Sequence, residues 1–228
     1  MDLSINNFSC YDMCSSFLHN KYYTSCNSFS YTFKSGVYVL TGEIDCGAFA
    51  FCHSISDAAD KPRTLGADTH IYIDNTLAND ELLDKNICYL NKRKHIESDI
   101  YKELTFKSYL ERRLYETDLP YSTYDYFERF QVPSEYINRQ ICQLGSMYML
   151  VFYAIDGLLS KKSIFTMAWI GRSLKIGNTI NNLFHGLQYD DSICIIPSSR
   201  FAGLPDVAIK LEMASLFDDP NVRLEYME

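Results

Sequence analysis

The sequence lacks the long apolar run that a transmembrane helix needs. No segment approaches the roughly 20 consecutive apolar residues that cross a bilayer, although 47% of the 228 residues are hydrophobic. Residues 1–12 also lack the charged and then apolar pattern of a secretory signal peptide. We therefore expect a protein that stays in the cytoplasm and does not itself cross the membrane.

Positive charge is scarce as well. Lysine and arginine total 21 against 29 acidic residues, which gives a net charge of −8. Because a nucleic-acid binder neutralises phosphates with a basic face, this balance argues against a nucleic-acid partner. The only basic run, "NKRKH" at 91–95, is typical of a solvated loop.

Metal-binding patterns are also missing. The eight cysteines are scattered, and the close pair Cys10 and Cys14 has no second pair that would complete a zinc site. In a reducing compartment, such cysteines are best interpreted as small buried hydrophobic side chains. We expect no metal site.

The chain has the size and composition of one folded unit. Charged residues make up 22% of it, an ordinary fraction for a globular protein. It contains no long linker, low-complexity tract or strong internal repeat. We predict a single domain over residues 1–228, with a helical subdomain at approximately 96–160.

Strands dominate the prediction for the first part of the chain. "SYTFKSGVYVLTG" (30–42) contains two β-rich pieces around residues 34–36, which have the composition of a hairpin turn. "THIYIDN" (69–75) alternates between apolar and polar residues, as a half-buried strand does. Between them, "AFAFCHSIS" (48–56) predicts a short buried helix that begins after a glycine turn.

Helices and strands alternate in the prediction for the second half. Helical periodicity dominates 96–162, with the strongest helix at Ser146–Leu159, and the uncharged run 163–170 is typical of a buried parallel strand. We then expect, in order, a helix at 173–188, a strand at 190–199, a closing helix at 206–219 and a last strand at 222–228. This alternation favours a right-handed parallel α/β core.

The segment "YVLTGEIDCGAFAFCHSIS" (38–56) combines a strand, a glycine turn and a helix. Gly42 and Gly47 have the spacing of the glycines in a loop that binds phosphate through backbone N–H groups. That loop continues with a lysine and a serine or threonine, but Ala48 and Phe49 follow here. Taken alone, the spacing favours coincidence.

The order of the elements across nearly the whole chain resembles the ATP-binding cassette domain, the nucleotide-binding subunit of membrane transporters. The segments that carry the resemblance are, in chain order, "FSYTFKSGVYVLTGEIDCG", "RTLGADTHIYIDN", "NICYLNK", "ELTFKSYLERRL", "QLGSM", "LLSKKSIFTMAWIGRSL" and "ICIIPSSR". The resemblance implies an α/β fold of the P-loop NTPase type. This fold has a mostly parallel sheet core, an N-terminal antiparallel β portion and a helical subdomain.

The resemblance also assigns positions to a nucleotide site. Tyr11 lies roughly where the family has an aromatic residue that stacks on adenine, and Gly42, Gly47, Ala48 and Phe49 align with the phosphate loop. In the family, the loop lysine contacts the β- and γ-phosphates and the loop hydroxyl binds Mg²⁺. Because both are replaced here, the resemblance implies a vestigial nucleotide site.

Other family positions are substituted too. Lys92 aligns with the Q-loop glutamine, and Ala168 and Trp169 align with the two acids of the Walker B motif. Neither of these two side chains binds a metal or accepts a proton, and we interpret Trp169 as a packing residue. No histidine occurs at 198–200, where the family has its switch histidine.

Gly145, Ser146 and Met147 resemble part of the family's signature motif and precede the long apolar helix. Gly145 and Ser146 could offer backbone N–H groups and a hydroxyl to an anion. Equally, Ser146 could simply cap the helix.

These substitutions remove the phosphate clamp, the metal ligand and the water activator together. The resemblance therefore implies a degenerate cassette subunit with no catalytic residue and no bound cofactor, peripheral on the inner face of the cell membrane. Its partners would be a second nucleotide-binding subunit, identical or different, and an integral membrane permease. Tyr121, Tyr124, Tyr126 and Phe127 form either a permease-docking surface or the core of the subdomain.

Two alternatives stay open. A divergent ATPase would bind and hydrolyse Mg·ATP with substituted acids such as Glu43, Asp45, Asp190 or Asp191, and with Lys92 as its phosphate-facing cation. A soluble scaffold or regulatory protein would use the same fold without a transporter.

Overall fold

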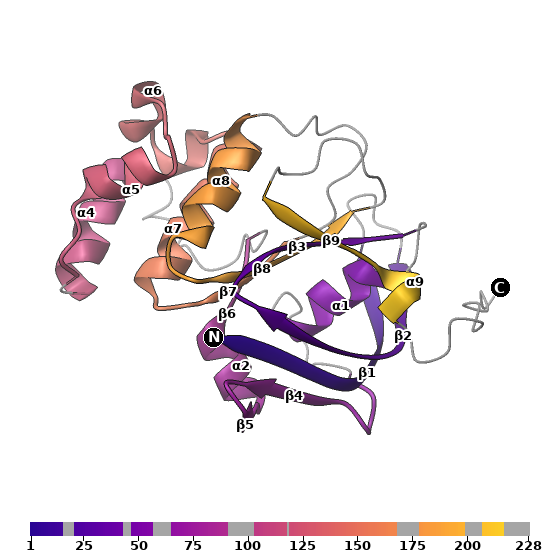
Figure 1. Ribbon diagram of the computed structural model, residues 1–228. Helices are drawn as coiled ribbons and strands as arrows, with labels where there is room; N and C mark the ends of the chain where they lie inside the picture. Colours follow the sequence, from indigo (N-terminus) through magenta and orange to yellow (C-terminus); the bar gives the residue numbers. More distant parts are fainter. Residues whose placement is uncertain are drawn as a thin grey trace.

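The computed structural model describes most of the chain. The described ranges are 1–15, 21–42, 47–56, 65–90, 103–117, 119–167, 178–198 and 207–216. Within them the chain forms two β-sheets and a group of helices (Figure 1). None of the helices in these ranges has the length and apolar character that a bilayer crossing demands.

The N-terminal sheet is antiparallel and is built on one long pair of strands. Its strands are β1 (Asp2–Ser15), β2 (Lys21–Lys34), β4 (His70–Ile73) and β5 (Thr76–Leu77), in the order β2-β1-β4-β5. The β1–β2 pairing runs from Asp2 opposite Lys34 to Ser15 opposite Lys21, with irregularities on either side of Phe8. The predicted strand at 69–75 is confirmed as β4.

The second sheet is parallel and forms the centre of the molecule. Its strands are β6 (Ile87–Tyr89), β7 (Ile164–Thr166), β8 (Ile193–Ser198), β3 (Gly36–Thr41) and β9 (Ala208–Glu212), in that spatial order. Every neighbouring pair in it is parallel. The predicted α/β class, with a parallel core and an antiparallel N-terminal portion, is confirmed.

Two predictions about local structure are wrong. Residues 34–36 do not close a hairpin, because β2 pairs with β1 whereas β3 crosses to the parallel sheet, where the Gly36 N–H donates to the Ser192 carbonyl oxygen. The predicted helix at 206–219 is instead strand β9 followed by the short helix α9 (Met213–Leu216). Pairing with β3 outweighs the helical pattern there. The predicted strand at 222–228 lies outside the described residues.

The parallel sheet separates two hydrophobic cores. Side chains alternate across its faces, so Tyr38 and Leu40 of β3 enter one core and Val37 and Val39 enter the other. Helix α1 (Ala48–Ile55) lies between the two sheets and contacts β1, β2 and β8. Helices α7 (Ser146–Leu159) and α8 (Asn178–Gln188) cover the opposite face (Figure 1).

Four phenylalanine rings connect α1 to the antiparallel sheet. The centroid of the Phe51 ring lies 4.8 Å from that of Phe8, 5.2 Å from that of Phe29 and 5.8 Å from that of Phe33. All four side chains are fully buried. Edge-to-face and stacked pairs at these separations stabilise a core beyond the area they bury, so this cluster fixes α1 against the strands.

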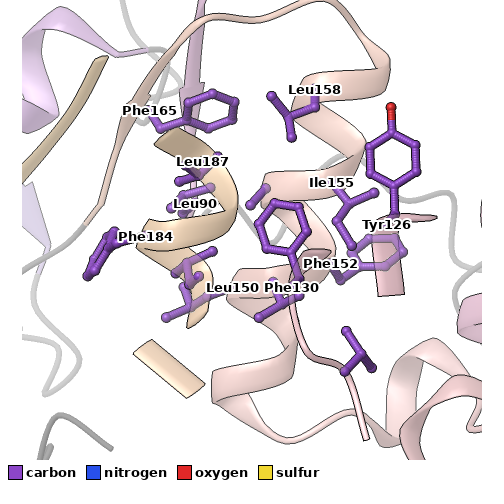
Figure 2. Packing of buried hydrophobic residues seen from close by; sticks show 14 of the residues in the cluster. Leu90, Tyr126, Phe130, Leu150, Phe152, Ile155, Leu158, Phe165, Phe184 and Leu187 are labelled. Carbon is purple, nitrogen blue, oxygen red and sulfur yellow. The ribbon is translucent and has the colours of Figure 1, made fainter. Parts of the chain in front are cut away.

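The remaining helices divide between the two cores. Helix α2 (Asp80–Asn86) lies beside β6, and its Leu83 is buried in the same core as α1. The core covered by α7 and α8 also contains residues of α4 (Phe106–Thr117), α5 (Thr123–Arg129), α6 (Ser134–Ile137) and the 3₁₀ turn Ile141–Gln143. These helices extend from α7 away from the antiparallel sheet. Figure 2 shows Phe130, Leu150 and Phe152 among the buried side chains between these helices and α8. The predicted helix Ser146–Leu159 is confirmed as α7.

A polar cluster ties α4 to α7 beside this core. The Tyr109 hydroxyl donates to Asp156 Oδ1 at 2.7 Å, and Arg113 Nε donates to the same oxygen at 3.2 Å. Arg113 also donates to Ser160 Oγ at 2.8 Å. The pKa of Tyr109 is raised, first because burial penalises the phenolate and second because the Asp156 carboxylate repels it.

Replacing Phe51 tests the packing of α1. We expect Phe51→Ala to lower the free energy of unfolding by about 3–5 kcal/mol, because the truncation leaves a cavity between the two sheets. Urea unfolding followed by circular dichroism measures the change. Tyr115→Ala is the control, since its ring is 91% exposed, and it should change stability by less than about 0.5 kcal/mol. Equal losses in the two variants would contradict the described packing.

Replacing Tyr109 tests the polar cluster. Tyr109 ionises near pH 10 in the unfolded chain and at a higher pH in the folded protein, so its stabilising effect is complete below pH 10 and is lost as the pH rises further. We expect Tyr109→Phe to cost about 1 kcal/mol at neutral pH. The variant should also show a shallower stability loss above pH 10.

Urea titrations at neutral and alkaline pH measure both effects in Tyr109→Phe. Tyr115→Phe, on the exposed side of the same helix, is the matched control and should follow the unsubstituted chain. Parallel alkaline slopes for Tyr109→Phe and the unsubstituted chain would show that the cluster is not formed in solution.

Candidate functional site

The candidate site begins where β3 leads into α1. Strand β3 ends at Thr41, Gly42 follows it, and α1 begins at Ala48 directly after Gly47. Gly47 has φ 87° and ψ −10°, a left-handed conformation that favours glycine, and its carbonyl oxygen accepts the first helical hydrogen bond from Phe51 N at 2.9 Å. The predicted strand–glycine–helix geometry is therefore present. Residues 43–46 lie outside the described residues.

The start of α1 is buried and apolar. Ala48 is 0% exposed, and Gly47 is buried as well. A β-carbon added to Gly47 would lie 3.0 Å from Cys26 Sγ and 3.1 Å from Cys26 Cα. Strand β2 thus packs directly on the first turn of α1, where a phosphate loop would need space for an anion and a lysine side chain to hold it.

Phe49 continues this apolar surface with a short row of rings. Its ring stacks on the His53 ring at a centroid distance of 5.6 Å, and His53 meets the edge of Tyr89 at 6.1 Å. The row extends from α1 to the end of β6. An aromatic side chain in this place cannot supply the hydroxyl that binds Mg²⁺ in a phosphate loop. The sequence did not predict the ring contacts of His53, because His53 belongs to no recognisable motif.

Hydroxyl groups occupy the carboxyl ends of the central strands. In doubly wound α/β proteins this edge of the sheet is where ligands bind. Thr41 ends β3 opposite Ser198, which ends β8, and Thr166 ends β7. All three side chains are buried, and the Thr166 hydroxyl has no hydrogen-bond partner among the described residues. The edge therefore presents neutral hydroxyls rather than charges at these three ends.

Three of the predicted positions cannot be placed. Ala168 and Trp169, aligned with the Walker B acids, and Lys92, aligned with the Q-loop glutamine, lie outside the described residues. In the part of the chain that the structure describes, no three histidine, cysteine or acidic side chains gather as metal ligands would.

Tyr11 lies on β1 opposite Ser25 of β2. Its neighbour Cys10 pairs with Cys26, the residue that packs on Gly47. The backbone of Tyr11 is therefore one residue along β1 from the Cys10–Cys26 pair beside the start of α1, and its role in a nucleotide site stays a prediction.

The signature-like segment lies at the start of α7. Gly145 is the residue preceding the helix and Ser146 begins it; both are exposed, whereas Met147 is half-buried. No side chain caps this end of α7, so the interpretation of Ser146 as the cap is wrong. Among the described residues, nothing lies within 4 Å of a β-carbon built on Gly145. The start of α7 is therefore open on the side of Gly145 and Ser146.

Three side chains form a stack beside the start of α7. The rings of Tyr136 and Tyr148 lie face to face at 3.7 Å, and the Arg139 guanidinium lies 4.3 Å from the Tyr136 centroid. This stack holds α6 against the first turn of α7. The positive charge of Arg139 therefore lies beside the exposed signature-like segment.

The tyrosine-rich segment 121–127 divides between surface and core. Tyr126 and Phe127 are buried in the core of the helical part, whereas Tyr121 and Tyr124 are 52% and 61% exposed. The sequence alone left both roles open; the core role is confirmed for Tyr126 and Phe127, and the docking role of Tyr121 and Tyr124 stays a prediction.

Asp190 and Asp191 lie at the opposite edge of the sheet from Gly42. They immediately precede β8, which runs parallel to β3, so the length of a strand of roughly 17 Å separates them from the end of β3. Asp190 also accepts a hydrogen bond from Arg129 at 2.7 Å. Neither side chain can therefore act at the start of α1.

Comparisons with known proteins identify the fold. No protein-family model matches the sequence, and no curated protein matches it either. Solved structures of ATP-binding cassettes do match the chain. A protein from Pyrococcus furiosus described as an ABC transporter ATP-binding protein superposes with a TM-score of 0.60 at 13% identity, covering 92% of this chain and 98% of that chain.

Two structures of one further cassette match over a similar extent. A dimeric ATP-binding cassette in a post-hydrolysis state, bound to ADP and Pi, has a TM-score of 0.58 at 16% identity and covers 92% of this chain and 94% of its own. A dimeric bacterial ABC transporter cassette has a TM-score of 0.56 at 14% identity over the same shares. At these identities the likeness shows the fold: this chain has the fold of an ATP-binding cassette.

Substituting Gly47 tests the close contact at the start of α1. We expect Gly47→Ala to lower the free energy of unfolding by at least about 1–3 kcal/mol, because alanine is strained at φ 87° and its β-carbon would meet Cys26. Gly145→Ser is the control, since its φ of −62° and open surroundings accept a side chain. It should change stability by a few tenths of a kcal/mol. Urea unfolding of both variants measures the change. A Gly47→Ala variant as stable as the unsubstituted chain would contradict the close contact between Gly47 and Cys26.

Proposed function

We propose that this chain is a degenerate, catalytically inactive ATP-binding-cassette subunit of a membrane transporter. The observation that carries the proposal is the start of α1, where Ala48 is 0% exposed and β2 packs on Gly47. A cassette that hydrolyses ATP needs a lysine and a metal-binding hydroxyl at the positions of Ala48 and Phe49. Here the helix keeps its glycine and its direction while the charged group is replaced by a buried methyl.

Electrostatics supports the loss of hydrolysis. Phosphoryl transfer depends on cations and oriented dipoles that stabilise charge on the transferred phosphate. The segment between Gly42 and Gly47 contributes Glu43 and Asp45, whose negative charges repel a triphosphate by kilocalories per mole at close range. Ala168 supplies no carboxylate at the Walker B position. Each change opposes Mg·ATP binding or turnover independently of the others.

The proposal includes a second cassette subunit as partner. Similar structures are dimeric cassettes, and in the resembling family each nucleotide site combines one phosphate loop with the signature segment of the partner. Gly145 and Ser146 of this chain are exposed at the uncapped start of α7. In a pair with an intact cassette they would complete the partner's site, although this chain's own loop cannot hold a nucleotide.

The proposal also includes contact with a membrane permease at the inner face of the cell membrane. Tyr121 and Tyr124 are exposed on the helical part, and Lys107 Nζ donates to the Tyr124 hydroxyl at 3.4 Å. Aromatic residues are enriched at protein interfaces. The single cassette domain would cover residues 1–228, with its helical subdomain at approximately 96–160.

Nucleotide measurements test the loss of activity. We expect the purified chain to show no Mg·ATP turnover above background. The double variant Ala48→Lys, Phe49→Thr should remain inactive, because a restored phosphate loop still lacks a metal-binding acid and a water activator. An intact cassette assayed alongside is the positive control. Turnover by the unsubstituted chain would contradict the proposal and favour the divergent ATPase.

Purification from cells tests the partners separately. A tagged full-length chain should copurify with an intact cassette and a polytopic membrane protein. Substituting Tyr121→Ala and Tyr124→Ala together should reduce recovery of the membrane protein, whereas Tyr115→Ala, an exposed tyrosine outside the segment, should not. An inactive chain that copurifies with neither partner would favour a scaffold or regulatory protein instead.

A further inference from the structure

Two cysteines face each other across the long strand pair. Cys10 of β1 is directly opposite Cys26 of β2 in the antiparallel register. Residues opposite one another in such a pair project their side chains to the same face of the sheet, with Cα atoms about 4.5–5.5 Å apart. This separation lies within the range of about 4.4–6.8 Å that a disulfide spans.

Both thiols lie in the core between the sheets. Cys10 is 5% exposed and Cys26 is 4% exposed, and both are reduced in this structure. Cys26 packs on Gly47 at the start of α1. Cys10 lies next to one of the irregularities of the β1–β2 register. At such an irregularity the ladder of hydrogen bonds is interrupted, which provides a place for the strands to open to a small reagent.

Another pair of cysteines provides a contrast within the same molecule. Cys88 of β6 and Cys194 of β8 are both paired with Phe165 of β7, so one strand lies between them. Two inter-strand spacings place their backbones roughly 9.5 Å apart, which is beyond the reach of a disulfide. Cys10 and Cys26 therefore differ from Cys88 and Cys194 in lying on adjacent strands directly opposite each other.

We propose that Cys10 and Cys26 are a reversible dithiol–disulfide site, oxidised by a low-molecular-weight disulfide. The thiolate of one cysteine attacks the small disulfide, forming a mixed disulfide and releasing one small thiol. The thiolate of the second cysteine then attacks the protein sulfur of the mixed disulfide and releases the other small thiol. The small disulfide is reduced to two thiols, which take up the two protons that the cysteines lose.

The bond would link β1 and β2 directly above the start of α1. Because it closes a short chain segment, it restricts the unfolded chain and stabilises the folded one. It would also hold β1 and β2 together at the position where Cys26 packs on Gly47. This inference does not depend on the proposed function.

Peptide mapping after oxidation tests the site. The full chain carrying Cys14→Ser and Cys46→Ser is incubated with oxidised glutathione, so that the remaining six cysteines are those that the structure describes. Trypsin cleavage after Lys21 and Lys34 then yields peptides 1–21 and 22–34, each with one cysteine. We expect these two peptides to be linked, with a mass decrease of two hydrogen atoms. The melting temperature of the oxidised protein should rise by roughly 5–10 °C.

Three controls make the outcome decisive. Cys10→Ser in the same background should lose both the link and the rise in melting temperature, whereas Cys194→Ser should keep both. The unsubstituted chain covers the case in which a variant does not fold. Its peptide 1–21 contains Cys14 as well as Cys10, so fragmentation of the linked peptides should place the bond at Cys10. Glutathione adducts without a link, or a link between other peptides only, would overturn the proposal.

Discussion

The packing of β2 on the first turn of α1 is the contact on which the rest of the structure depends. Cys26 approaches Gly47 so closely that a β-carbon on Gly47 would lie 3.0 Å from Cys26 Sγ and force a shift. Phe51 anchors the same helix against Phe8 and Phe29. This contact joins the antiparallel sheet to the parallel one. It also buries Gly47 and Ala48 at the start of α1.

The sequence predicted the elements whose signal is local. The apolar run from Met147 to Ile155 predicts the helix Ser146–Leu159, and the glycine turn before Ala48 predicts where α1 begins. Neither prediction needs information from distant residues. The sequence-based prediction failed where pairing with a distant strand determines the secondary structure. Residues 208–212 become a strand because β3 pairs with them, and the two pieces around Gly36 have similar β-rich composition although they belong to different sheets. Periodicity carries no information about which sheet a strand joins.

The candidate site shows the same division. The spacing of Gly42 and Gly47 predicted a strand, a turn and a helix. The sequence also showed that Ala48 and Phe49 replace the lysine and the hydroxyl residue of a phosphate loop. The burial of Gly47 was not predictable, because it results from a contact with Cys26 in another strand. The ring contact between His53 and Tyr89 could likewise not be predicted, since the two residues belong to no common sequence motif. Together these contacts describe the fold of an ATP-binding cassette in which the first turn of α1 packs into the hydrophobic core.

A crystal structure of the chain soaked with magnesium and a non-hydrolysable ATP analogue tests this account most directly. The account predicts that α1 begins as described, with Cys26 against Gly47, and that no triphosphate density lies between Gly42 and Phe49. Density for a γ-phosphate held by the backbone N–H groups of Gly47, Ala48 and Phe49, with β2 displaced from the helix, would contradict it.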